Sequence, residues 1–188
     1  MKKTVLKSLI LIVSITFASC SAIKVNEDIV KSFIDARNNY DVAKVNTFID
    51  KNYQETFIDG SIEIENPAQL KNIILWGKEL NSHIKVIDIK SDGNKVVTIE
   101  ENTNYLDVAL KRKARKFKIV YHFFNKKIQK QKIDTLAGYS QISRFNSDRF
   151  MEFVKYCEQN NLNYNYPFNQ ENGKQLRKVL ERYKNLNE

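Results

Sequence analysis

The spacing of apolar residues changes along this chain, and that change is the strongest constraint on its fold. Before His83, apolar residues recur three or four positions apart, as on one face of a helix. After it they alternate with polar ones in "HIKVIDIK", "KVVTIEENTNYLDVAL", "KFKIVYHFF" and "IQKQKIDTL", with turn signals at Asp92-Gly93 and Asn125-Lys126. The sequence therefore predicts helices followed by a curved antiparallel sheet, which is an α+β arrangement.

Three helices are expected ahead of that sheet. Asn26 is a candidate N-cap for the first, Asp41 for the second, and Asn66-Pro67 opens the third. Between the second and third, "NYQETFIDGSIEIE" predicts a hairpin that turns at Asp59-Gly60. Helices packed into the concave face of a sheet leave a cone whose mouth can hold a ligand.

The N-terminus has the layout of an export signal. Lysines precede a short apolar stretch from Ser8 to Phe17, which is about half the roughly 20 residues that a permanent membrane span needs. The segment Phe17-Ala18-Ser19-Cys20 resembles a bacterial lipobox, which implies that the chain is cleaved before Cys20 and that Cys20 carries lipid, palmitate included. We therefore expect a lipoprotein signal peptide at 1–19, a lipidated tether at 20–26, and a protein of the cell envelope held on a membrane by the lipid on Cys20. An ordinary secretory signal with an incidental cysteine is the alternative.

Residues 27–136 resemble the NTF2-like, or SnoaL-like, superfamily. The resemblance rests on "VKSFIDARNNYDVAKVNTFIDKNY", on Phe57 to Asp59, on "NPAQLKNIILW" and on "YHFFNKKI". It implies an NTF2-like cone of three N-terminal helices packed on a curved antiparallel sheet.

Residues 137–188 lie outside the resemblance and are expected to form a helical C-terminal extension. Asn146 or Ser147 is a candidate cap for a helix in which Cys157 shares an apolar stripe with Phe150 and Phe153, so Cys157 is expected to be a buried structural thiol. A second helix carries Leu176, Val179, Leu180 and Tyr183 on one side. These faces would pack on the core domain, with a partner protein as the alternative.

Familiar catalytic motifs are absent from the sequence. It has no glycine-rich phosphate loop, no G-x-S-x-G and no H-E-x-x-H, and its two histidines lack a helical ligand spacing, so no metal or cofactor is expected. The basic run from Lys111 to Lys118 is a candidate contact with an anionic surface through Lys111, Arg112, Lys113 and Arg115, or else a solvated hairpin end. Nucleic acid is not an expected partner of an exported protein, and a homodimer is left open.

Aromatic residues and one carboxylate are the candidate ligand contacts, with plain core packing as the alternative: Tyr53, Phe57, Trp76, Glu100, Tyr105, Tyr121 and Phe123. Of Glu100 and Glu101, neighbours on a strand, one must face inward, where burial would raise its pKa and suit it to acid–base work. Glu55 and Asp59 are rival candidates.

The expected function is binding without catalysis, in which the cone takes a small hydrophobic molecule or peptide, or its surface docks a partner. An enzyme such as an isomerase or dehydratase acting on a hydrophobic substrate is one alternative, and a structural envelope protein with a filled cone is another. An open cavity with a buried carboxylate would favour the enzyme, an open apolar cavity the binding protein, and a filled cone the structural protein.

Ketosteroid isomerase activity is not expected. Comparison with that branch of the superfamily places its helical Tyr at Phe33, its strand acid at Ile119 or Val120, and its base at Thr56 or Phe57.

Overall fold

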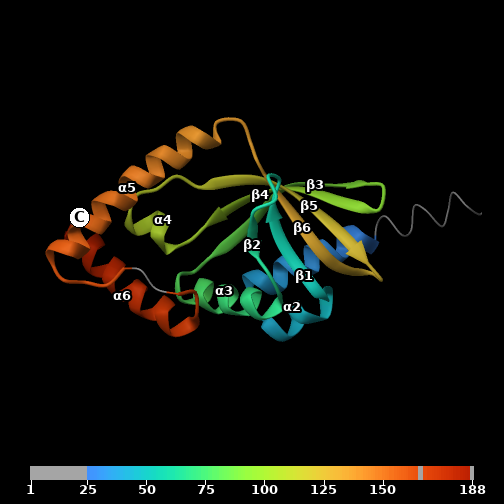
Figure 1. Ribbon diagram of the computed structural model, residues 1–188, viewed down its shortest axis with the longest axis horizontal. Helices are drawn as coiled ribbons and strands as arrows, with labels where there is room; N and C mark the ends of the chain where they lie inside the picture. The colour runs from blue at the N-terminus through green and yellow to red at the C-terminus, as the bar shows by residue number, and fades with distance from the viewer. Residues whose placement is uncertain (1–24, 165–166, 187–188) are drawn as a thin grey trace, which may run out of the picture.

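The computed structural model describes residues 25–164 and 167–186. The expected signal peptide and Cys20 lie outside the described residues. Figure 1 shows a curved sheet with helices on one face and a second group of helices at one end. In the described ranges, no helix is both long enough and apolar enough to cross a membrane.

A helix over residues 25–38 comes first, so Asn26 lies inside it and does not cap it. The other helices are α2 (Val42–Phe48), α3 (Pro67–Glu79), α4 (Tyr105–Ala109), α5 (Tyr139–Gln159) and α6 (Gln170–Leu186). The strands are β1 (Ile49–Phe57), β2 (Ile62–Ile64), β3 (His83–Asp92), β4 (Lys95–Thr103), β5 (Arg115–Phe124) and β6 (Lys127–Thr135).

Two of the predicted helix starts are confirmed by their caps. The Asp41 side chain accepts a hydrogen bond from the backbone N–H of Lys44 at 2.9 Å, and the Asn66 side chain accepts one from Gln69 at 3.0 Å. Each bond satisfies one of the backbone donors that a helix leaves free at its N-terminus. Local sequence therefore determines where α2 and α3 begin.

The six strands form one sheet in the order β2-β1-β6-β5-β4-β3. The prediction of an all-antiparallel sheet is wrong in one place, because β1 pairs with β6 in parallel. The other neighbours pair antiparallel. Alternation along a strand indicates which residues share a face, but it does not say which distant strand lies alongside.

The segment after β4 is also different from its prediction. Residues 105–109 form α4 and do not continue the strand. The Asn104 side chain accepts a hydrogen bond from the N–H of Asp107, and the Asp107 carboxylate accepts one from the N–H of Asn104. This reciprocal capping box starts a helix and ends the strand at Thr103. It moves Tyr105 off the sheet.

The buried apolar residues of the described ranges form two cores. The larger lies between the sheet and the first helices, around the buried residues Phe33, Tyr53 and Tyr121. The smaller joins the end of α3 to α4, α5 and α6, with Phe153 and Cys157 fully buried. Burial raises the pKa of the Cys157 thiol to about 11, as expected for a structural cysteine.

The C-terminal helices therefore pack on the rest of this chain. The first of them, α5, begins at Tyr139, earlier than the predicted cap at Asn146. The Asn146 amide instead donates to the carbonyl oxygen of Lys113 at 2.9 Å and accepts from its N–H at 2.8 Å, which ties the middle of α5 to the segment before β5.

Candidate functional site

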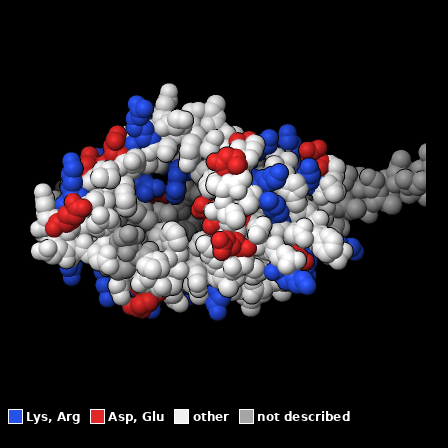
Figure 2. Space-filling view, viewed as in Figure 1, with Lys and Arg blue, Asp and Glu red and all other residues white. Residues whose placement is uncertain are grey.

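A cavity of about 300 Å³ lies between the concave face of the sheet and the helices. The first helix, α3, all six strands and the start of α5 contribute to its lining. Figure 2 shows a hollow on this face of the molecule, with Lys and Arg atoms on one rim and Asp and Glu atoms on the other. The cone is therefore open, and its lining is charged as well as apolar.

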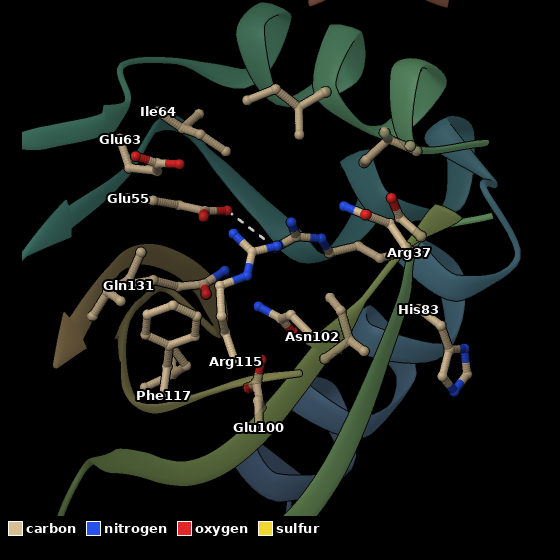
Figure 3. A pocket seen from close by; sticks show the side chains of 18 of the residues that line it. Arg37, Glu55, Glu63, Ile64, His83, Glu100, Asn102, Arg115, Phe117 and Gln131 are labelled. Carbon is tan, nitrogen blue, oxygen red and sulfur yellow. Dashed lines mark hydrogen bonds and ion pairs between the residues drawn. The ribbon is translucent and has the colours of Figure 1, made fainter. Parts of the chain in front are cut away.

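An ion pair lies inside this cavity. Arg37 of the first helix donates from Nη1 to Glu55 Oε1 of β1 at 3.1 Å, and the two side chains are only 16% and 7% exposed. Burial alone would lower the pKa of Arg37, but the charge of Glu55, with smaller effects from Tyr53 and Tyr121, raises it above its ordinary value. Arg37 therefore stays a cation inside the cone (Figure 3).

Glu55 is also held from the other side. The Tyr53 hydroxyl donates to Glu55 Oε1 at 2.5 Å, and Gln131 Nε2 donates to the Tyr53 oxygen. Burial and the adjacent Glu55 charge raise the pKa of Tyr53 well above its usual value, so the phenol keeps its proton and donates. This chain of bonds fixes the Glu55 carboxylate in one position.

A second buried carboxyl group belongs to Glu100 of β4, which is 3% exposed. Its Oε1 accepts from the hydroxyls of Thr98 at 2.5 Å and Tyr121 at 2.6 Å. Burial raises the pKa of Glu100, while these two hydrogen bonds and the charge of Arg37 act in the opposite direction. Both of these hydrogen bonds are made to Oε1, and Glu100 also lines the cavity.

Arg115 and Asn102 are the lining residues with unsatisfied polar atoms. They are direct neighbours across β4 and β5. Arg115 Nε and Asn102 Oδ1 are both buried and have no hydrogen-bond partner in the described ranges. The Arg115 guanidinium points into the cavity, as that of Arg37 does from the opposite side (Figure 3). A donor and an acceptor therefore stand side by side, and neither is satisfied by the protein.

Much of the remaining lining is apolar. The apolar part comes mainly from α3 and the inward faces of the strands: Phe57, Ile64, Ile73, Ile74, Trp76, Phe117, Ile119 and Ile133. Glu63 of β2 is exposed and lines the rim. In the part of the chain that the structure describes, no group of three or more His, Cys, Asp or Glu side chains is placed to hold a metal ion.

Sequence comparison finds no relatives for this arrangement: no protein-family model matches the chain, and no curated protein matches it closely. Solved structures do match its fold. An LEH-like epoxide hydrolase from M. tuberculosis has a TM-score of 0.53 at 13% identity, over 71% of this chain and 98% of that one. A cystatin-fold protein from Novosphingobium aromaticivorans has a TM-score of 0.51 at 18% identity, over 57% of this chain and 96% of that one.

The fold is NTF2-like. A third match, Bal32a from a soil-derived mobile gene cassette, has a TM-score of 0.52 at 18% identity and covers 66% of this chain and 98% of that one. At such identities the likeness shows the fold and nothing about the reaction. The chemistry of this NTF2-like cone has to be argued from its own residues.

Only some of the residues predicted from sequence as ligand contacts line the cavity. Phe57, Trp76 and Glu100 line the cavity. Tyr53 and Tyr121 lie one layer behind it, fully buried, with their hydroxyls on Glu55 and Glu100.

Tyr105 and Phe123 are not part of the cavity lining. Tyr105 packs in the smaller core, where the guanidinium of Arg177 lies over its ring at 3.3 Å from the centroid. Phe123 is partly buried against the larger core. Sequence reasoning placed Tyr105 in the cone because it extended the strand through the segment that folds as α4.

The basic run from 111 to 118 does not form one surface. Arg112 pairs with the buried Asp107 at 3.2 Å, and Lys116 pairs with Glu101 at 3.4 Å. Lys113 lies over the ring of Phe145. Arg115 faces the cavity. Arg112, Lys113 and Arg115 therefore do not share one surface that an anionic partner could contact.

The sequence analysis did not place Arg37, Asn102, Arg115 or Gln131 in the cone, and it expected Arg115 on an anionic contact surface instead. A signal existed for Arg115, because the alternation that turns Phe117 inward also turns Arg115 inward. Arg37 likewise follows Phe33 by four positions on the apolar stripe of its helix, where a charged residue needs a buried partner.

Proposed function

We propose that this protein is an exported, lipid-anchored protein whose NTF2-like cone binds a small molecule without turning it over. The observation that carries the proposal is the unsatisfied pair Arg115 Nε and Asn102 Oδ1 inside an open cavity of about 300 Å³. A buried polar group left without a partner costs about 1–3 kcal/mol. A ligand that bonds to both groups would recover this energy on binding.

The ligand that fits this lining is amphipathic. Its polar end would lie against the arginines and carboxyl groups, and its apolar end against Trp76, Phe117 and the isoleucines of α3. This changes the expectation of a purely hydrophobic molecule, since burying only apolar groups would leave Arg115 unsatisfied. A structural protein with a filled cone does not agree with a cavity of about 300 Å³.

The membrane anchor in this proposal is the lipid on Cys20. Several acyl chains hold a folded domain on a membrane, because each buried methylene contributes roughly 0.8 kcal/mol. We expect Cys20→Ser to abolish fatty-acid labelling and to release the protein from membranes into the soluble fraction. Labelling that persists in Cys20→Ser would rule out this anchor.

Native mass spectrometry of residues 21–188 tests the binding function. We expect a small molecule to be retained by the wild type and to be lost in Arg115→Met. The matched control is Lys118→Met, because Lys118 is exposed on the outward face of the same strand. A wild-type protein that retains nothing from its native host, or a variant pair that retains the ligand equally, would contradict the proposal.

Catalysis is the second candidate, and Glu100 is the specific reason. A buried carboxyl group with a raised pKa in an open cavity is typical of a general acid or base in an enzyme. Binding comes first because the groups that lack partners are an arginine and an amide, which hold ligands and do not exchange protons near neutral pH. If the retained ligand is converted to a product, Glu100→Gln should stop the conversion while the ligand still binds.

A further inference from the structure

We infer that the ligand of this cone is an organic acid that carries a hydroxyl group next to its carboxylate, with the carboxylate on Arg115 and the hydroxyl on Asn102. This rests on the proposed binding function and names the chemical class of its ligand. Three features of the cavity support this ligand: a cation that forms no ion pair in the described ranges, an acceptor without a donor, and an apolar wall beside them.

Arg115 is the cation in question. Neighbouring basic residues already have acidic partners: Arg37 pairs with Glu55, and Arg112 pairs with Asp107. Arg115 forms no ion pair or hydrogen bond with any residue in the described ranges, and the one carboxyl group whose pKa its charge lowers is Glu63, with which it makes no direct contact of either kind. A guanidinium is a planar fork of donors that matches the two oxygens of a carboxylate. A carboxylate that enters the cone therefore finds a complementary group already in place.

The acidic residues of the cavity do not prevent this. Glu55 is neutralised by Arg37 and held by Tyr53. Burial raises the pKa of Glu63 and the nearby charge of Arg115 lowers it, but these two side chains form no ion pair in the described ranges. Burial raises the pKa of Glu100 and so favours its neutral form. The net charge facing an incoming anion is therefore small, and Arg115 is the cation of the lining that no carboxylate in the described ranges pairs with.

A carboxylate alone does not complete the site. Asn102 Oδ1, directly across the strand pair from Arg115, is an acceptor, and an ionised carboxylate has no hydrogen to donate. Cross-strand neighbours have Cβ atoms about 4.5–5.5 Å apart, so one small group can reach both side chains. A hydroxyl on the carbon next to the carboxylate supplies the missing donor at that separation.

The apolar lining of the same cavity indicates which substituent the acid has on its hydroxyl-bearing carbon. Phe117 pairs with Glu100 two residues along from the Arg115–Asn102 pair, and Trp76 and Ile73 approach from α3. A ring or branched alkyl group on the hydroxyl-bearing carbon would lie against these side chains. Mandelate, an α-hydroxy acid with a phenyl ring, has all three features and is a suitable probe.

The experiment compares three probes that differ by one group each: mandelate, phenylacetate without the hydroxyl, and mandelamide without the charge. Their dissociation constants would be measured by chemical-shift perturbation on folded residues 21–188. We expect mandelate to bind in the millimolar range or tighter, and about tenfold tighter than either analogue, since one net hydrogen bond is worth roughly a factor of ten.

Variants assign each preference to its residue. Arg115→Met should remove the preference for mandelate over mandelamide, and Asn102→Ala should remove the preference for mandelate over phenylacetate. Arg115→Lys keeps the charge without the fork and should retain part of the first preference, so the test survives if the Met variant does not fold. Lys118→Met should leave both preferences unchanged.

The outcomes separate this inference from the function on which it rests. Equal binding of the three probes, together with a ligand that is retained by the wild type and lost in Arg115→Met, would refute the ligand class and leave the binding function standing. A preference for mandelate that Arg115→Met and Asn102→Ala leave intact would also refute it. No retained ligand and no probe binding would overturn both.

Discussion

The ion pair between Arg37 and Glu55 gives the sharpest prediction for stability. Glu55→Gln keeps the shape of the side chain and an oxygen that can accept the hydrogen bond from Tyr53, but it removes the charge facing Arg37. The two side chains are 7% and 16% exposed, so solvent cannot replace the lost partner. Removing one member of such a buried pair is expected to cost about 3–5 kcal/mol.

The double variant tests whether this cost comes from the pair itself. In Arg37→Met with Glu55→Gln, the uncompensated charge is gone and an apolar side chain of similar length takes its place. Replacing a whole buried ion pair by neutral groups is often nearly neutral, so the double variant should recover at least about 2 kcal/mol relative to the sum of the single variants.

Urea and thermal unfolding followed by circular dichroism provide the measurement. For a domain of this size, each kcal/mol lowers the melting temperature by about 2–4 °C, so Glu55→Gln should melt roughly 6–20 °C below the wild type. The control is Glu152→Gln in the surface pair Arg149–Glu152, whose side chains are 32% and 53% exposed, and its effect should stay below about 1 kcal/mol. If Glu55→Gln costs no more than this control, or if the two single effects add, the reasoning about the buried pair is refuted.

Three further predictions concern packing, pH and activity. Gly173→Ala should lower the melting temperature although alanine favours helices by about 1 kcal/mol, because its Cβ would lie 3.0 Å from the backbone oxygen of Trp76 and overpacking typically costs about 1–3 kcal/mol; an unchanged or higher melting temperature would contradict this. Because the folded-state pKa of Glu100 is raised, its protonated form stabilises the fold fully below the ordinary value of 4.5, and this stability is lost as pH rises through the folded pKa. Glu100→Gln should therefore gain stability relative to the wild type between pH 4 and pH 7 in urea unfolding, and a parallel pH profile would refute it. Residues 21–188 should not isomerise a β,γ-unsaturated ketosteroid, and turnover above buffer that is lost on mutating Glu55 or Asp59 would show that the expected alignment is wrong.

Local signals in the sequence were sufficient where one short segment determines its own structure. The Asn66 cap and the left-handed backbone at Asn125 and Lys126, with φ of 48° and 62°, depend on residues within a few positions. The same locality explains an error. The alternation of "TNYLDVAL" resembled a strand, but the capping box between Asn104 and Asp107 is a stronger local signal, and it decided in favour of a helix.

Non-local features could not be predicted in the same way. The parallel pairing of β1 with β6 joins segments about 80 positions apart, and no periodicity encodes it. The candidate site contains one feature that depends on local sequence and one that depends on distant residues. The inward direction of Arg115 follows from strand alternation, whereas its lack of a partner depends on where Glu55 and Asp107 already point. Sequence thus indicates which residues face the cone, and only the packed structure shows which of them are satisfied.

The C-terminal extension has a physical connection to this site. Gly173 lets α6 approach the backbone of α3 at Trp76, where any larger residue would be obstructed. Phe168, just before α6, packs edge-on against the Trp76 ring with 5.0 Å between centroids. Trp76 is also a wall of the cavity, and Tyr139 at the start of α5 is another. The C-terminal helices therefore support a wall of the cone from behind. Because Trp76 is held between Phe168 and the cavity, a change in the packing of α6 would alter the shape of the apolar wall without touching any residue that binds through Arg115 or Asn102.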